Sequence, residues 1–265
     1  AMKDQLGIDG VFASTSFSAG EDWRWQTHLA NIPVYYEFKD KGISDSDTLD
    51  FTYAQNFQNI FDLYINNSVT DRTQLADKTV DDSMQEFAHG KCAMVQNGNW
   101  AWSQISSVEG NVVGEDDVKF FPIYTGVTGE ENQGLCIGTE NYICVNKLAS
   151  KEQQQASIDF MEWVYSSDKG KSYVTNELGF ISPFNTFSDD ESPSDPLAKE
   201  VLEYMNDSSK YSVSWNFTAF PNQKFKDDFG SELLEYCKGE VDFATVTSTV
   251  KQLWAEQKEA QKEGQ

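Results

Sequence analysis

The chain has 265 residues, a formal net charge of −23 and an apolar content of 39%. This length allows one sizeable core or two modest ones, and the apolar content excludes general disorder. Nucleic acids and anionic membrane surfaces repel so acidic a protein, so we expect no nucleic-acid partner. No apolar run of the sequence is long enough to span a membrane.

An acidic and aromatic cluster follows the first twenty residues: Glu21, Asp22, Trp23, Arg24 and Trp25. Carboxylates bond hydroxyl groups, and indole rings stack on the apolar faces of sugar rings, so Glu21, Asp22 and Trp23 are candidate ligand-binding residues. A solvated loop is the alternative for the two acids. A core position is the more favoured reading for Trp25, and we expect Arg24 to pair with a nearby acid.

Residues 51–66 are predicted to form an amphipathic helix. Phe57, Ile60, Phe61 and Tyr64 follow the spacing i, i+3, i+4 and i+7, which places them on one face. Such a stripe is typical of core packing rather than of ligand binding.

Residues 84–105 combine a short helix, a strand and a turn. Met84 and Phe87 have helical spacing, Gly90 ends that helix, and residues 92–96 are predicted to form a buried strand. Residues 97–99, Asn-Gly-Asn, then form a turn that presents Trp100 and Trp102 at the carboxyl end of the strand, where α/β sheets bind ligands. Asn97, Asn99 and Trp100 are therefore candidate sugar-binding residues, with core packing as the alternative for the two tryptophans.

The second half of the chain alternates strands and helices, which predicts an α/β fold. Strands are expected at 118–124 and 135–145. Helices are expected from a capping box at Ser150 to about 165, at 167–178 with Gly179 as its cap, from Asp195-Pro196, at 222–238 and at 243–259. Residues 208–221 form an aromatic-rich loop that contains Trp215 and Phe220.

The run from Phe87 to Ala101 resembles a known pattern, F-x-x-G-x-x-A-M-x-x-x-G-x-W-A. This pattern belongs to the family 1 extracellular solute-binding proteins, the maltodextrin-binding protein group of ABC importers. Residues 20–25, 138–147 and 179–183 resemble further segments of that family in the same order. The resemblance covers nearly the whole chain.

The resemblance implies a type II periplasmic-binding-protein-like fold with two lobes. Residues 1–117 and 180–265 would form the C-terminal lobe, and residues 118–179 would be the late segment of the N-terminal lobe. Family members carry an earlier segment, so we expect a truncated chain. The exposed segment would then be able to self-associate. The apolar residues that would lack a partner are Leu135, Ile137, Ile143, Val145, Ile158 and Met161.

The function implied by the resemblance is binding of an oligosaccharide, without catalysis or cofactor, for uptake through the membrane permease of an ABC importer. Glu21 would bind hydroxyls, Trp23 and Trp100 would stack on the sugar, and Trp215 and Phe220 lie where a late aromatic enters the cleft. The intact protein would be a lipoprotein at the extracellular face or in the periplasm, and we expect this chain to lack the signal peptide.

Two other functions remain open from the sequence. The chain could be a fragment with little or no ligand binding. It could also be a glycoside-acting enzyme in which Glu21 or Asp22 is half of a carboxylate pair, but nothing in the sequence identifies the second carboxylate. No metal-ligand or nucleophile motif is present, and the sequence does not identify the sugar.

Overall fold

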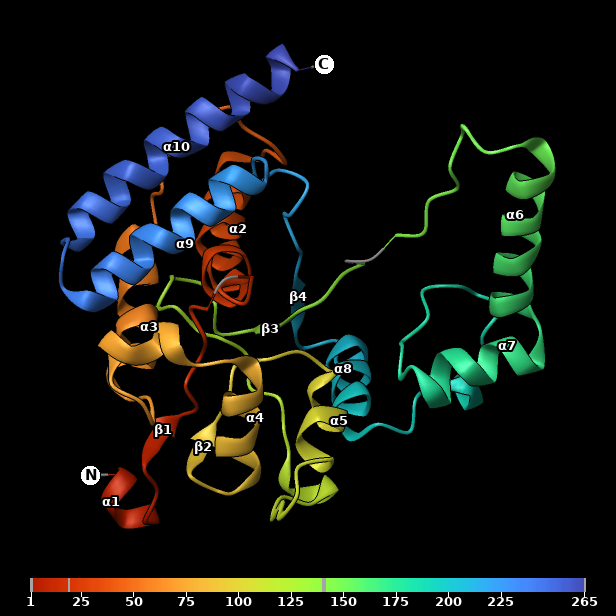
Figure 1. The fold of residues 1–265 in the computed structure, drawn as a ribbon, viewed down its shortest axis with the longest axis horizontal. Coiled ribbons are helices and arrows are strands. Elements are labelled where there is room, and N and C mark those ends of the chain that lie inside the picture. Colours follow the sequence, from red (N-terminus) through yellow and green to blue (C-terminus); the bar gives the residue numbers. More distant parts are fainter. Residues whose placement is uncertain (1, 19, 140–141, 265) are drawn as a thin grey trace.

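The computed structural model describes residues 2–18, 20–139 and 142–264, which form a larger and a smaller part (Figure 1). The larger part, the body, contains the described residues up to 139 and from 192 onward. The smaller part, the arm, contains residues 142–191 and projects to the right of the body in Figure 1. An ion pair between Lys171 Nζ and Glu191 Oε1, at 2.6 Å, joins the helical part of the arm to its last residues.

Helices make up most of both parts. The body contains α1 (Met2–Leu6), β1 (Gly10–Phe12), the π-helical turn η1 (Arg24–Leu29), α2 (Ala30–Lys41), α3 (Ala54–Asn66), η2 (Arg72–Asp77), α4 (Val80–Ala88), β2 (Cys92–Met94), α5 (Ala101–Ser106), η3 (Glu115–Asp117), β3 (Gln133–Cys136), α8 (Pro196–Asn206), β4 (Tyr211–Val213), α9 (Gln223–Lys238) and α10 (Phe243–Glu263). The arm contains α6 (Lys151–Ser166), α7 (Asp168–Ser172), η4 (Tyr173–Glu177) and η5 (Asp189–Glu191).

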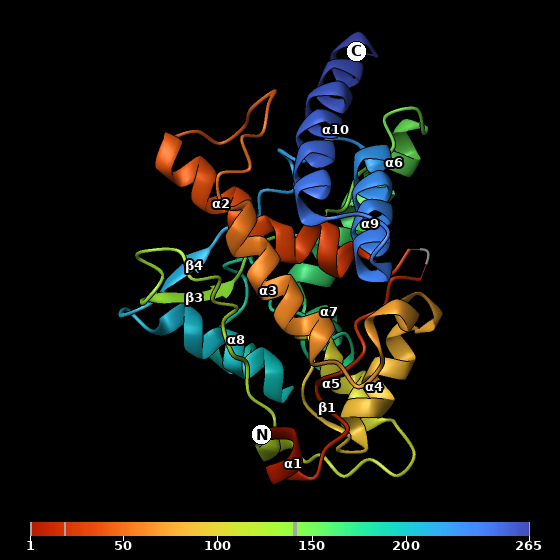
Figure 2. The ribbon, with the colours of Figure 1, turned by 90° about the vertical axis from the view of Figure 1, so that its left-hand side faces the viewer.

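The strands form two small parallel sheets of two strands each. In the first sheet, Gly10 of β1 pairs with Cys92 of β2, and in the second, Gln133 of β3 pairs with Tyr211 of β4. The second sheet lies beside α8 in both Figure 1 and Figure 2. The fold is therefore a helix-rich mixture with small parallel sheets, and the predicted strand at 118–124 is wrong because those residues have no regular secondary structure.

The main core of the body is built largely from aromatic rings. Helices α9 and α10 lie side by side and cover one side of it (Figures 1 and 2). Phe57, Phe61 and Tyr64 of α3 point into this core, as their spacing predicts. Trp25 is also fully buried there, which confirms the core reading of that residue.

Helix α2 crosses the body without a helical pattern in its sequence. It is buried on almost every side, and Pro33 lies in its second turn. Proline provides no backbone N–H, and its ring crowds the carbonyl of the residue four positions earlier, here Leu29. The wider π-helical turn η1 directly precedes this point and gives the proline ring room. The sequence reading missed this helix because a helix buried all round has no polar face.

Several predicted helix ends are confirmed. The side chain of Ser150 accepts a hydrogen bond from Gln153 N, and Gln153 completes the capping box of α6. Asp195 caps α8 by accepting from Ala198 N, and Pro196 is the first residue of that helix. Gly90 and Gly179 have φ values of +67° and +64°, the left-handed conformation predicted after their helices.

The arm is much less buried than the body. Helix α6 has sixteen residues, and none of them is buried. Ile143 and Ile158 are exposed, whereas Leu135, which was also expected to lack a partner, is buried beside β4. Residues 118–139 belong to the body, where Val127 packs on Ile32 and Tyr36 of α2. The lobe boundaries at 117/118 and 179/180 stay a prediction.

Within the described part of the chain, no helix is both long and apolar enough to cross a membrane. The same residues contain no group of three or more histidine, cysteine or acidic side chains that could hold a metal ion.

Candidate functional site

A cleft of about 1480 Å³ lies between the body and the arm. Its body side is formed by η1, the loop of residues 96–100 and the end of β3. Its arm side is formed by one face of α6, by η4 and by residues 178–186. Pockets for small ligands usually enclose about 300–1,000 Å³, so this cleft has room for an extended ligand.

Four aromatic side chains form a continuous row along the body side of the cleft, here called the aromatic wall. The ring centroids of Trp100 and Trp23 are 6.0 Å apart, those of Trp23 and His28 4.5 Å, and those of His28 and Trp215 4.9 Å. Trp100 is 41% exposed. The rings come from three distant segments of the chain, so only the tertiary fold joins them.

Gly98 and Gly138 have no side chain and so leave room for the rings of Trp100 and Trp215. A Cβ atom on Gly98 would lie 2.2 Å from the ring of Trp100, and one on Gly138 would lie 3.1 Å from the ring of Trp215. A Cβ atom essentially never lies as close as 2.2 Å to a ring carbon. A side chain at position 98 would therefore displace the Trp100 ring from the cleft.

Some polar side-chain groups in and beside the turn at residues 97–99 have hydrogen-bond partners within the protein, and others do not. Asn97 Oδ1 accepts from Gly98 N at 3.0 Å, and Asn97 Nδ2 donates to Gln104 Oε1 at 3.1 Å, so this amide mainly shapes the turn. Asn99 also lines the cleft, and no hydrogen bond joins its side chain to another described residue. Gln96 donates from Nε2 to Arg24 O at 3.0 Å, while its Oε1 is buried without a partner.

Arg24 lines the cleft beside the aromatic wall and is only 5% exposed. Its guanidinium carbon is 4.1 Å from the centroid of the Trp23 ring. It donates to the backbone oxygen of Glu21 at 3.4 Å and to Asn97 Oδ1 at 3.3 Å. Burial lowers the pKa of Arg24 to about 10, and the negative charge of Glu21 opposes this shift. The expected ion pair is absent, since no described carboxylate lies within salt-bridge distance of Arg24.

The predicted site residues fall into two groups. Trp23, Asn97, Asn99, Trp100 and Trp215 all line the cleft. Glu21, Asp22 and Phe220 do not. Phe220 is only 4% exposed and packs on Trp254, with ring centroids 5.3 Å apart.

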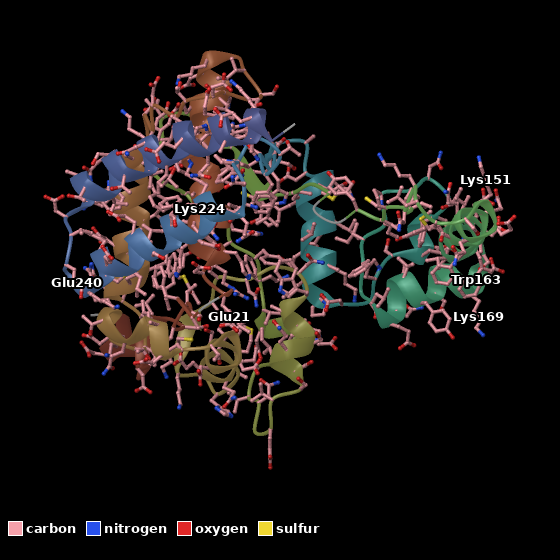
Figure 3. The ribbon with its side chains drawn as sticks, turned by 45° about the horizontal axis from the view of Figure 1, so that its top comes forward. Glu21, Lys151, Trp163, Lys169, Lys224 and Glu240 are labelled. Carbon is pink, nitrogen blue, oxygen red and sulfur yellow. The ribbon has the colours of Figure 1, made fainter. Side chains whose placement is uncertain are left out.

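Glu21 and Asp22 both have contacts inside the body. Glu21 Oε2 accepts from Ser18 Oγ at 2.9 Å and from Val80 N at 2.8 Å, at the first turn of α4. Figure 3 labels Glu21 within the body. Asp22 packs against α9, where a Cβ on Gly230 would lie 1.9 Å from its Oδ2. Burial raises the pKa of Asp22, the charge of Asp227 adds to this, and hydrogen bonds from its own backbone and from Gln26 oppose it.

Arg24, His28 and Gln96 also line the cleft, although they were not among the predicted site residues. Arg24 and His28 are four residues apart, so one face of a helical turn presents both. That spacing could have indicated a shared face, but only after residues 24–29 had been identified as helical. His28 lies between Trp23 and Trp215 and completes the aromatic wall.

A protein-family comparison gives one match over most of the chain. The family model described as bacterial extracellular solute-binding protein matches residues 3–202. The matched part includes Trp23, Arg24 and Trp100 and ends before Trp215. No curated protein and no solved structure matches the chain.

Proposed function

The chain belongs to the bacterial extracellular solute-binding proteins, and on this premise we propose that its cleft binds an oligosaccharide for uptake by an ABC importer. The family accounts for extracellular binding of a solute for transport, and its members are generally non-catalytic. The sugar and the ABC permease are our proposal.

The aromatic wall is the observation that supports a sugar. A row of rings offers apolar faces on which successive pyranose rings stack, while neighbouring amides bond their hydroxyl groups. Asn99 has such an amide available within the cleft. The volume of about 1480 Å³ favours several linked rings over a single one.

The proposal also includes the arrangement of the two lobes and the location of the protein in the cell envelope. We propose a type II periplasmic-binding-protein arrangement, with the arm in one lobe and the body in the other. We further propose anchoring of the intact protein as a lipoprotein, with its cleft facing the periplasm or the extracellular medium.

Titration calorimetry against a panel of neutral oligosaccharides tests the sugar. Trp23→Ala and Trp100→Ala should each weaken binding by about 1–3 kcal/mol, because each removes one stacking surface. Trp163→Ala is a matched control: this ring is also 41% exposed but lies on the arm, outside the cleft lining (Figure 3). Absence of heat with every sugar would instead support a fragment with little or no ligand binding.

The glycoside-acting enzyme remains the alternative that an activity assay decides. We expect no release of reducing ends from any oligosaccharide. Product release by the wild-type chain that is lost in Glu21→Gln would contradict the binding-protein proposal. The position of Glu21 against α4 supports a structural role for this carboxylate.

We also propose self-association through the arm. Helix α6 exposes Phe160 and Trp163, whose rings stack with centroids 6.0 Å apart, and Leu148 before it is also exposed. A second copy of the chain would cover these residues. Light scattering over a range of concentrations should show dimers that the double variant Phe160→Ser, Trp163→Ser loses. A wild-type monomer at all concentrations would contradict the proposal.

A further inference from the structure

Arg24 is a charged group that the proposed binding of a neutral sugar does not explain. It lines the cleft although its side chain is almost fully buried, and it is the one cationic residue among the described residues of the lining. Burying a guanidinium costs free energy unless it is paired, and buried arginines usually have a carboxylate partner. To the described residues the Arg24 side chain makes two hydrogen bonds, both long and both to uncharged oxygen atoms.

The surroundings of Arg24 hold its guanidinium in one orientation. Trp23 covers one face of the group, so the edges, which carry the N–H donors, remain for hydrogen bonds. Two of the five donors are used, by the backbone of Glu21 and by Asn97. The Glu21 carboxylate itself is held by Ser18 and Val80. A planar guanidinium fixed in this way matches a carboxylate in a two-point contact.

The charges elsewhere in the cleft favour a single position for such a carboxylate. The acidic residues among the described part of the lining are Glu115, Glu162, Glu177 and Asp195. These side chains would repel an anionic group at other places along the cleft. Arg24 would attract it to the end of the aromatic wall formed by Trp23 and Trp100.

We propose that the cleft selects sugars that carry a carboxylate, such as uronic-acid oligosaccharides, and that Arg24 binds this carboxylate while Trp23 stacks on the same or the adjacent ring. This inference rests on the proposed sugar binding and adds the class of sugar. Gln96 lines the cleft beside Arg24, to whose backbone oxygen its Nε2 donates at 3.0 Å.

Matched ligands test the proposal on the unaltered chain. Titration calorimetry compares digalacturonic acid with galactobiose and with the methyl ester of digalacturonic acid, and cellobiouronic acid with cellobiose. In at least one pair the acid should bind about 10- to 100-fold more tightly than its neutral counterpart, because a charge-assisted two-point contact is lost. The methyl ester should bind like the neutral sugar.

Variants of Arg24 locate the effect. Arg24→Gln should abolish the preference for the acid over its neutral counterpart, and Arg24→Lys should retain part of this preference because a lysine keeps the charge but not the planar contact. Arg72→Gln is the control: Arg72 donates to the backbone oxygens of Tyr236 and Cys237 outside the cleft, so this variant should keep the full preference.

Failure of this inference differs from failure of the proposed function. If the unaltered chain binds these sugars but prefers the acid in none of the pairs, the role of Arg24 is overturned while sugar binding stands. If it binds neither member of any pair, sugar binding and the inference fall together. If the Arg24→Gln variant does not fold, the comparison of acidic and neutral ligands on the unaltered chain still tests the proposal.

Discussion

Helix α2 in the body and helix α6 in the arm are both well-formed helices, but they bury very different shares of their side chains. Eight of the twelve residues of α2 are buried, and none of the sixteen residues of α6 is. Helix α6 begins with a full capping box, whereas α2 has no side-chain cap and contains Pro33. Packing therefore stabilises the first helix, and local hydrogen bonds stabilise the second.

This difference predicts two levels of stability within one chain. An isolated helix of about sixteen residues is marginal in water, because nucleation is costly and propagation gains little per residue. Segments with few buried contacts open locally at low free energy, whereas core helices open only with global unfolding. We expect the arm to open while the body remains folded.

Thiol labelling should give the largest contrast between the two parts. Cys144 is exposed at the start of the arm, whereas Cys92 and Cys237 are buried in the body. Burial raises the pKa of the Cys92 and Cys237 thiols to about 12, so at pH 8 almost no reactive thiolate forms there. Alkylation followed by mass spectrometry should show Cys144 reacting about 1,000-fold faster or more. Equal rates at the three positions would contradict the burial of the body thiols.

Core truncation should give the next largest contrast. Phe57→Ala should lower the free energy of unfolding by about 3–5 kcal/mol, because Phe57 is fully buried between Phe61 and Phe229. Phe160→Ala in α6 should change it by no more than about 0.5 kcal/mol, because Phe160 is 62% exposed. Denaturant unfolding at low protein concentration measures both. A large loss for Phe160→Ala would mean that the arm packs on a partner under those conditions.

Helix caps should give the smallest and most local effects. Asn222 accepts from Phe225 N at the start of α9, and Asn222→Ala should lower global stability by about 1 kcal/mol. Ser150→Ala should cost α6 a similar amount, but hydrogen exchange of the α6 amides should detect this change and global unfolding should not. A fall in the global unfolding free energy for Ser150→Ala would show that body and arm unfold together.

Part of the candidate site could be predicted from the sequence. The turn at residues 97–99 and the glycine at position 98 predict that Trp100 is displayed at the end of a strand, and it lies there with 41% of its surface exposed. Trp23 and Trp215 also line the cleft. Glu21 and Asp22 do not, although they are next to Trp23 in the sequence. Adjacent side chains on a helical turn point in different directions, so neighbourhood in the sequence did not place these acids in the cleft.

The sequence alone determined the helices that have local signals: the capping box at Ser150, Asp195-Pro196 before α8, the apolar stripe of α3 and the glycines that end α4 and η4. These features act within a few residues, so they can be read without the fold. Only the tertiary structure decided that α2 is a helix, because its stability comes from the burial of eight of its twelve residues. Only the tertiary structure brought Trp100, Trp23, His28 and Trp215 into one row beside Arg24, because contacts between segments far apart in the chain form that row.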